Sequence, residues 1–258
     1  MKKMPILFVG HGSPMNAIEN NSFTKGWVEI AKNILKPEAI LSVSAHWTTN
    51  GSRVNDEKQS KTVYDMYGFP QELYDIKYEP QGAPEIAHMI AGIAENVLID
   101  NSWGIDHGTW SVLHVMYPDA DIPVLQLSIN QNETRQYHFE LGAKLKALRE
   151  KGVLIIGSGN VVHNLGRVNW NMAGGYEWAY EFDNYIKDNI ISREFTNVTE
   201  YLKAGKSAEQ AFYTTEHFDP LLYILGASDE NDRLTIFNND CTLGALSMTS
   251  YLFEPSEM

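Results

Sequence analysis

The chain has 258 residues, of which 43% are hydrophobic and 21% are charged, with 20 Lys and Arg set against 33 Asp and Glu. Its formal net charge of −13 repels phosphate backbones and anionic lipids, which argues against nucleic-acid and membrane partners. Cys241 is the only cysteine, which excludes an internal disulfide and a metal site made of several thiolates. Such cysteine usage is typical of a reducing compartment, so we expect a cytoplasmic protein.

Four short apolar runs, each as long as a strand covered on both faces, predict buried strands at residues 6–9, 40–43, 124–129 and 153–156. The first run ends at His11, so we interpret it as a strand rather than part of a signal peptide. No run approaches the roughly 20 apolar residues that span a bilayer.

The helical spacing of apolar residues predicts helices between and after these strands, at residues 84–96, 133–151 and 175–202. The second should end at Gly152. Asp219 and Pro220 predict the N-cap and first turn of a helix that continues through residues 221–225. The tail predicts one or two further strands at a sheet edge, within residues 233–237 and 243–253.

The alternation of strands and helices predicts an α/β fold. We expect a single domain over residues 1–258, with a mainly parallel or mixed central sheet covered by helices on both faces. Residues 48–82 stand apart, because they are polar at first and then rich in Tyr, Phe, Gly and Pro. A loop of this length is either a lid or pocket wall, or a surface excursion packed by its own aromatic rings.

Three of the eight histidines follow predicted strands closely, namely His11, His46 and His163. Parallel strands end at one edge of a sheet, where ligands usually bind, so these imidazoles could meet there. A single histidine after a strand is more often structural, but three in matching positions favour a function. His107 and His217 lie in predicted loops beside an acidic neighbour, where each is either an oriented site residue or an ordinary turn residue.

The remaining histidines, His88, His114 and His138, fall in helical or apolar segments, and we assign them structural roles. A cluster of neutral imidazoles with few carboxylates suits Zn, Fe(II), Cu or Ni better than Mg or Ca. The sequence lacks a dinucleotide fingerprint, a phosphate loop, a His-Glu-x-x-His helix and a nucleophile elbow. The histidine cluster is what remains, and it predicts one divalent transition metal as the cofactor.

Six motifs that span nearly the whole chain together resemble the class III extradiol ring-cleaving dioxygenases of the 4,5-DOPA dioxygenase type. They are HGSP at 11–14, SAHW at 44–47, YDMYGFP at 64–70, DHGTW at 106–110, GSGNVVHN at 157–164 and EHFDP at 216–220. The order and coverage of the motifs make the resemblance specific for the family, but much less specific for the substrate.

The resemblance implies that His11, His46 and His217 bind the metal. Fe(II) would be the metal for activity, and Zn(II) the metal expected in purified or crystallised protein, because zinc outcompetes Fe(II) for imidazole sites. His163 would either complete a four-histidine site or act as an acid/base beside the metal. His107 would be catalytic, facing the substrate and bonding to or deprotonating a catechol hydroxyl.

The third metal ligand could in principle be Glu216 instead of its neighbour His217, because more distant protocatechuate-type relatives use a glutamate there. The implied partners are a small aromatic diol and O2, bound by a monomer or a small homo-oligomer. Arg167 is a weak candidate for contact with a substrate carboxylate.

Three other functions share part of this pattern. A zinc hydrolase could use three histidines to activate water. The strand followed by His11, Gly12 and Ser13 also resembles the tetrapyrrole chelatases. That group, however, does not account for the motifs around His163 and His217. A non-catalytic binding protein could keep the same fold without the chemistry.

Overall fold

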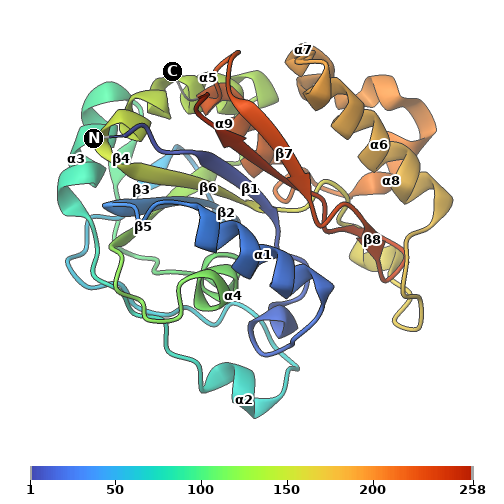
Figure 1. Ribbon diagram of the computed structural model, residues 1–258, viewed down its shortest axis with the longest axis horizontal. Coiled ribbons are helices and arrows are strands. Elements are labelled where there is room, and N and C mark those ends of the chain that lie inside the picture. The colour runs from blue at the N-terminus through green and yellow to red at the C-terminus, as the bar shows by residue number, and fades with distance from the viewer. Residues whose placement is uncertain (1, 257–258) are drawn as a thin grey trace.

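The computed structural model describes residues 2–256, and its centre is an eight-stranded mixed sheet (Figure 1). The strands lie in the order β4-β3-β5-β2-β6-β1-β10-β7. The four central strands run parallel to one another and are β5 (Val124–Asn130), β2 (Ala39–Thr49), β6 (Val153–Gly159) and β1 (Ile6–Gly10). The α/β prediction is therefore confirmed, and each predicted buried run is one of these four strands.

Short and antiparallel strands complete the sheet at both edges. On one side β10 (Ser250–Glu254) pairs antiparallel with β1, and β7 (Arg233–Phe237) pairs antiparallel with β10 at the edge. On the other side β3 (Arg53–Val54) pairs antiparallel with β5, and β4 (Leu98–Ile99) pairs parallel with β3. A separate two-stranded sheet joins β8 (Cys241–Thr242) to β9 (Leu246–Ser247). The tail thus adds the predicted strands, of which β7 lies at the edge of the sheet and β10 lies between β7 and β1.

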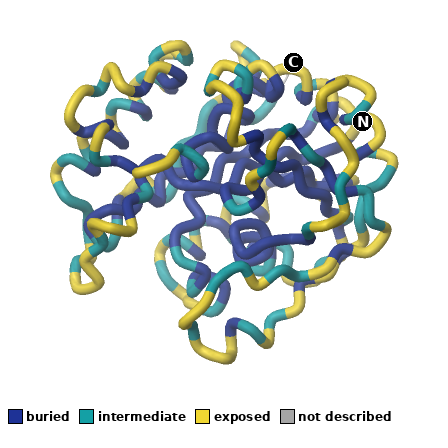
Figure 2. The backbone as a smooth tube through the Cα atoms, turned by 180° about the vertical axis from the view of Figure 1, so that it is seen from behind, coloured by how far each residue is buried: buried dark blue, intermediate teal, exposed yellow. Residues whose placement is uncertain are grey.

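Successive residues of the central strands point into two different hydrophobic layers. In β1, Ile6 and Phe8 belong to one layer, and Leu7 and Val9 to the other. The first layer lies under α3 (Pro84–Ile93), α5 (Arg135–Leu145), α6 (Glu177–Ile191) and α9 (Asp219–Ala227). The second lies under α1 (Ser22–Asn33) and α4 (His107–Met116). Helices thus cover both faces in Figure 1, and the buried strands in Figure 2 lie inside a shell of exposed loops.

The helix predictions hold in type but not always in length. A 3₁₀ turn over Lys146–Lys151 continues α5 and ends at Gly152, whose φ of 79° provides the left-handed C-cap. The predicted helix over 175–202 is broken near Arg193, at a φ of 60°, into α6 and α7 (Phe195–Thr199). Phe218, and not Asp219, is the N-cap of α9, since Asp219 is already its first helical residue.

Periodicity alone misses the helices α1 and α4, and it treats residues 48–82 as one loop. Most of α4 is buried, so its sequence lacks a polar face. Residues 48–82 contain the end of β2, strand β3 and the short helix α2 (Gln71–Tyr74). The remaining α-helix of the described residues is α8 (Ala208–Ala211), and 3₁₀ helices lie at Pro14–Ala17, Leu165–Arg167 and Tyr201–Ser207. Within residues 2–256, none of the helices has the length and apolar character needed to cross a bilayer.

Helices α5 and α9 approach each other closely because each turns a glycine toward the other. A Cβ atom on Gly142 would overlap the backbone of Tyr223, and one on Gly226 would overlap the backbone of Phe139. No larger side chain fits at either position. Since α9 begins directly after the segment that carries His217, this contact fixes where that segment leaves the sheet.

Gly226→Ala is expected to lower the free energy of unfolding by about 1–3 kcal/mol, because the added methyl group forces α5 and α9 apart. Urea denaturation followed by circular dichroism measures the change. Gly92→Ala is the matched control, since a Cβ there meets nothing within 4 Å and alanine favours the helix by up to about 1 kcal/mol. Equal destabilisation by both substitutions would contradict the close-packing explanation.

Candidate metal centre

Three histidines from distant parts of the chain converge at the carboxyl ends of the central strands. One ring nitrogen each from His11, His46 and His217 lies within 4.8 Å of the other two. The ring centroids of His46 and His217 are 4.9 Å apart, and those of His11 and His217 are 5.3 Å apart. The structure therefore brings together residues separated by more than 200 positions in the sequence.

The sheet itself positions two of these rings. His11 directly follows β1, and its backbone N–H donates to the carbonyl oxygen of Gly159 at 3.0 Å. His46 lies inside β2 rather than after it, because the strand continues to Thr49. The register with β5 shifts between Val43 and Thr48, so His46 occupies an irregular stretch of an otherwise regular strand.

His217 is held on a connection rather than on a strand. Its carbonyl oxygen accepts a hydrogen bond from the backbone N–H of Asn160 at 2.8 Å, just beyond the end of β6. A Cβ atom on Gly159 would overlap the same carbonyl group of His217. The glycine is therefore required for the chain to pass close enough for this ring to reach the other two.

Hydrogen bonds fix the tautomer of His11. Its Nδ1 atom lies 2.9 Å from Oγ of Ser158, and that hydroxyl donates its hydrogen to the carbonyl oxygen of Gly108 at 2.5 Å. Because the serine hydrogen is used there, Ser158 must accept the hydrogen on His11 Nδ1. The Nε2 atom of His11 then carries a free lone pair.

The other two rings show the same pattern. Nδ1 of His46 lies 3.2 Å from Oδ2 of Asp65, and Nδ1 of His217 lies 3.3 Å from Oε1 of Glu216. Nε2 of His46 faces Nε2 of His11 at 3.4 Å, and Nε2 of His217 is buried without a hydrogen-bond partner. A buried, unpartnered nitrogen is costly unless it binds an ion, so these residues fit a divalent metal.

Electrostatics keeps the three rings in the form that binds metal. Burial, reinforced by the neighbouring imidazoles, lowers the pKa of His11 and His217 well below the usual 6.5. Burial, with repulsion from His107, lowers the pKa of His46 to about 3. All three rings are therefore neutral near pH 7.

His107 lies beside this cluster, with its ring centroid 3.8 Å from that of His46. It is the first residue of α4 and not a loop residue, because the side chain of Asp106 caps the helix by accepting from the N–H of Thr109. Nδ1 of His107 lies 2.9 Å from Oδ2 of Asp65. The sequence reasoning did not single out Asp65, although it lies in one of the quoted motifs.

His163 stacks on His217 rather than pointing at the same place. The two ring centroids are 3.4 Å apart and the planes differ by only 4°. Burial lowers the pKa of His163 to about 4. An imidazole binds a metal through a lone pair in its own ring plane, so two parallel stacked rings are poorly placed to share one ion.

The other histidines and Arg167 have partners of a different kind. His138 accepts or donates a hydrogen bond at 3.0 Å with the hydroxyl of Tyr223, and the largely exposed His88 lies 3.3 Å from Asp56. His114 packs edge-on against the ring of Tyr78. The guanidinium of Arg167 lies 5.9 Å from the ring centre of Trp178.

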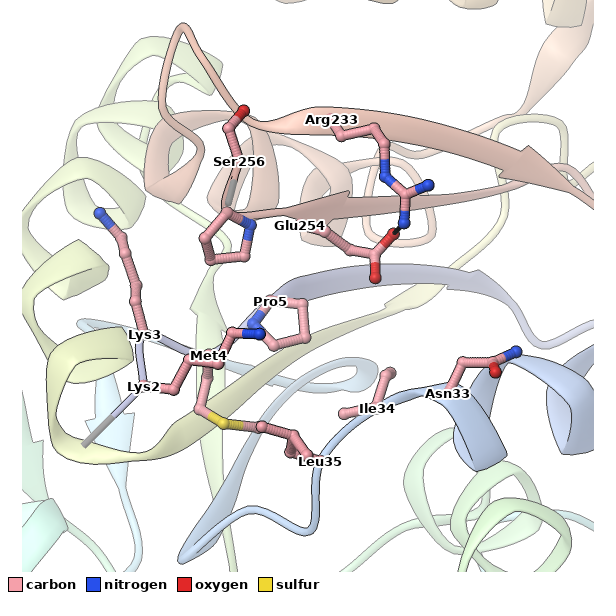
Figure 3. A pocket seen from close by; sticks show the side chains of 11 residues that line it. Lys2, Lys3, Met4, Pro5, Asn33, Ile34, Leu35, Arg233, Glu254 and Ser256 are labelled. Atoms are coloured by element: carbon pink, nitrogen blue, oxygen red, sulfur yellow. Dashed lines mark hydrogen bonds and ion pairs between the residues drawn. The ribbon is translucent and has the colours of Figure 1, made fainter. Parts of the chain in front are cut away.

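A pocket of about 540 Å³ lies at the opposite end of the sheet (Figure 3). Its walls come from the segment that leads into β1, the end of α1, and strands β7 and β10. Charged groups on its wall are paired, as Arg233 and Glu254 are at 2.6 Å. Because His11 follows the carboxyl end of β1, this pocket is separate from the histidine cluster.

Comparisons with known proteins show which families and structures this chain resembles. A family model described as the catalytic LigB subunit of aromatic ring-opening dioxygenase matches residues 4–253. The protein named 4,5-DOPA dioxygenase extradiol from Escherichia coli (strain K12) is 42% identical over 255 residues, which cover 96% of this chain and 94% of that protein. Its namesake from Beta vulgaris is 36% identical over 254 residues, covering 95% of each chain. A crystal structure of an uncharacterized Escherichia coli K12 protein superposes with a TM-score of 0.85 at 40% identity, covering 96% of this chain and 99% of that one.

His163→Gln is expected to reduce the loss of stability at acid pH. Because the pKa of His163 is about 4 in the folded protein and 6.5 otherwise, the unfolded chain takes up this proton first as pH falls. The free energy of unfolding therefore decreases from about pH 6.5 to 4, by up to about 3 kcal/mol from this group. Urea denaturation across this range should show a shallower decrease for the variant than for the wild type, and identical slopes would contradict the assignment.

Proposed function

We propose, from the premise that the chain belongs to the LigB family of aromatic ring-opening dioxygenases, that His11, His46 and His217 hold its metal. The chain is an extradiol dioxygenase that opens the ring of catechol-like substrates with O2. The observation that carries the metal proposal is the meeting of three Nε2 lone pairs, each on a ring whose Nδ1 faces a hydrogen-bond acceptor. Fe(II) is the proposed working metal, and Zn(II) the metal expected after purification.

The proposed substrate is a DOPA-like catechol, because the relatives from Escherichia coli and Beta vulgaris are both named 4,5-DOPA dioxygenase. We further propose that residues 1–258 form one catalytic domain and that the enzyme is a cytoplasmic monomer or small homo-oligomer. The aromatic part of residues 48–82 would wall the ring pocket, since Tyr64 packs edge-on against Trp110 of α4.

When bound, the metal would act as a Lewis acid toward both diol oxygens and would allow electrons to pass between the diol and dioxygen. His107 would take a proton from a diol hydroxyl and orient the ring, because it lies beside His46 without belonging to the three-histidine group. The buried surroundings of these rings would exclude water that competes with the substrate.

His163 is proposed as an acid/base next to the metal rather than as a fourth ligand. Its ring lies parallel to that of His217, so its nitrogens lie in a different plane from the Nε2 lone pair of His217. With a pKa of about 4, it is neutral near pH 7 and able to accept a proton.

Anaerobic loading with Fe(II), followed by addition of oxygen and L-DOPA, tests the function directly. We expect oxygen uptake and a yellow ring-opened product from the iron-loaded protein, and neither from the zinc-loaded protein. Hydrolysis of ester or amide substrates by the zinc form, without oxygen uptake by the iron form, would instead favour a hydrolase.

His107→Gln is expected to lower kcat by about 10²- to 10⁴-fold, because a general base is removed. The variant should still bind one metal ion per chain, measured by mass spectrometry after buffer exchange. His114→Gln is the matched control on the same helix, and it should keep normal turnover. Loss of the metal from the His107 variant would show that this residue is a ligand instead.

A pair of neighbouring substitutions distinguishes the two candidates for the third ligand. His217→Gln should abolish stoichiometric metal binding, because it removes an Nε2 lone pair from the cluster. Glu216→Gln should keep one metal ion per chain, with an affinity lowered by about 10-fold, because the amide oxygen can still accept from Nδ1 but the carboxylate charge is lost. The reverse result would identify the carboxylate as the ligand.

A further inference from the structure

A single carboxylate oxygen lies between two of the histidine rings. Oδ2 of Asp65 is 2.9 Å from Nδ1 of His107 and 3.2 Å from Nδ1 of His46. The other oxygen, Oδ1, accepts the backbone N–H of His107 at 2.9 Å, at the first turn of α4. The side chain of Asp65 is only 12% exposed, so water has little access to this contact.

The position of the carboxyl group makes Asp65 an acceptor toward the two rings. Its Oδ1 accepts the backbone N–H of His107, and its Oδ2 faces one nitrogen of each ring. A carboxylate accepts hydrogen bonds at both oxygens, whereas a protonated carboxyl group could donate its one hydrogen to only one of the two rings. A ring lone pair at Nδ1 would repel an acceptor oxygen at these distances, so the contact favours the hydrogen on Nδ1 of each ring, including the otherwise unpartnered Nδ1 of His107.

From this contact we infer that Asp65 is a positioning residue that sets the ring tautomers of His46 and His107 together. With both hydrogens on Nδ1, the Nε2 atom of each ring has a free lone pair. For His46 that lone pair faces His11 in the three-histidine cluster, and for His107 it is the base for the substrate. This inference rests on the proposed function for the roles of His46 and His107, but not for the tautomers themselves.

The nearby Asp106 does not fill this role. Its Oδ1 accepts from Ser44 at 2.6 Å and from the N–H of Thr109 at 3.2 Å, and its Oδ2 accepts from Trp103 at 3.2 Å and from Gln126. Asp106 thus uses both oxygens to cap α4 and to join it to the sheet. Asp65 is the acid that reaches the rings.

Asp65→Asn gives the sharpest test because it replaces an acceptor with a donor of the same shape. The N–H of His107 holds the amide oxygen at the place of Oδ1, so the amide NH2 group takes the place of Oδ2 and faces both Nδ1 atoms. Both rings are then driven to carry their hydrogen on Nε2. Asp65→Ala removes the acceptor without adding a donor, and leaves the tautomers free.

The full-length, zinc-loaded protein with 15N-labelled histidine reports the tautomer of His107 by NMR. We expect a protonated Nδ1 and a bare Nε2 in the wild type, and the opposite in Asp65→Asn. Zinc affinity, measured by competition with a chromophoric chelator, should fall by about 10- to 100-fold in Asp65→Asn and less in Asp65→Ala. Asp75→Asn, an exposed aspartate in the same segment, is the matched control and should match the wild type.

Two results would overturn the inference. One is an unchanged His107 tautomer with unchanged zinc affinity in Asp65→Asn. The other is binding of two zinc ions per wild-type chain with loss of one in this variant, since Asp65, His46 and His107 would then form a second metal site. Failure of the iron-loaded wild type to open any catechol would reject the proposed function, and the NMR and zinc measurements would still report on Asp65.

Discussion

The site depends on keeping several buried imidazoles neutral with their Nε2 lone pairs turned toward one another. The Nε2 atoms of His11 and His46 lie 3.4 Å apart, and His217 adds a buried nitrogen without a partner. Such an arrangement is unfavourable in the empty protein, because lone pairs repel and water is largely excluded. The surrounding fold must supply the stability that these rings do not, and a cation is the group that converts the repulsion into binding.

Each lone pair is directed by an acceptor on the opposite side of the ring, and these acceptors come from different parts of the fold. Ser158 belongs to β6, Asp65 to the long segment after β2, and Glu216 to the connection before α9. Two of them are carboxylates, so the outer groups would also place negative charge near a bound metal while the proposed ligands stay neutral. Charge balance and ring orientation thus arise from the same hydrogen bonds.

Much of this could be predicted from the sequence because it depends on short-range patterns. The apolar runs gave all four central strands, and the histidines after them drew attention to the correct edge of the sheet. Periodicity could not find α4, which is buried almost throughout and has no polar face. It also could not show that Asp65 reaches His107, because that contact joins positions 42 residues apart. Likewise, the stacking of His163 on His217 depends on side-chain rotation, which no spacing in the sequence encodes.

The proposed ligands and Asp65 differ in how firmly the chain holds them. His11 and His46 lie on or beside strands whose backbone groups are paired in the sheet, whereas His217 and Asp65 are carried by connections. An ion bound by all three histidines would tie the connections to the sheet, and because it binds only the folded arrangement, its affinity would add to the stability of that region. With the proposed ligands, metal binding and the order of residues 48–82 would therefore be linked. A substitution that loosens residues 48–82 would weaken metal binding through Asp65, and loss of the metal would in turn loosen the segment proposed to wall the substrate pocket.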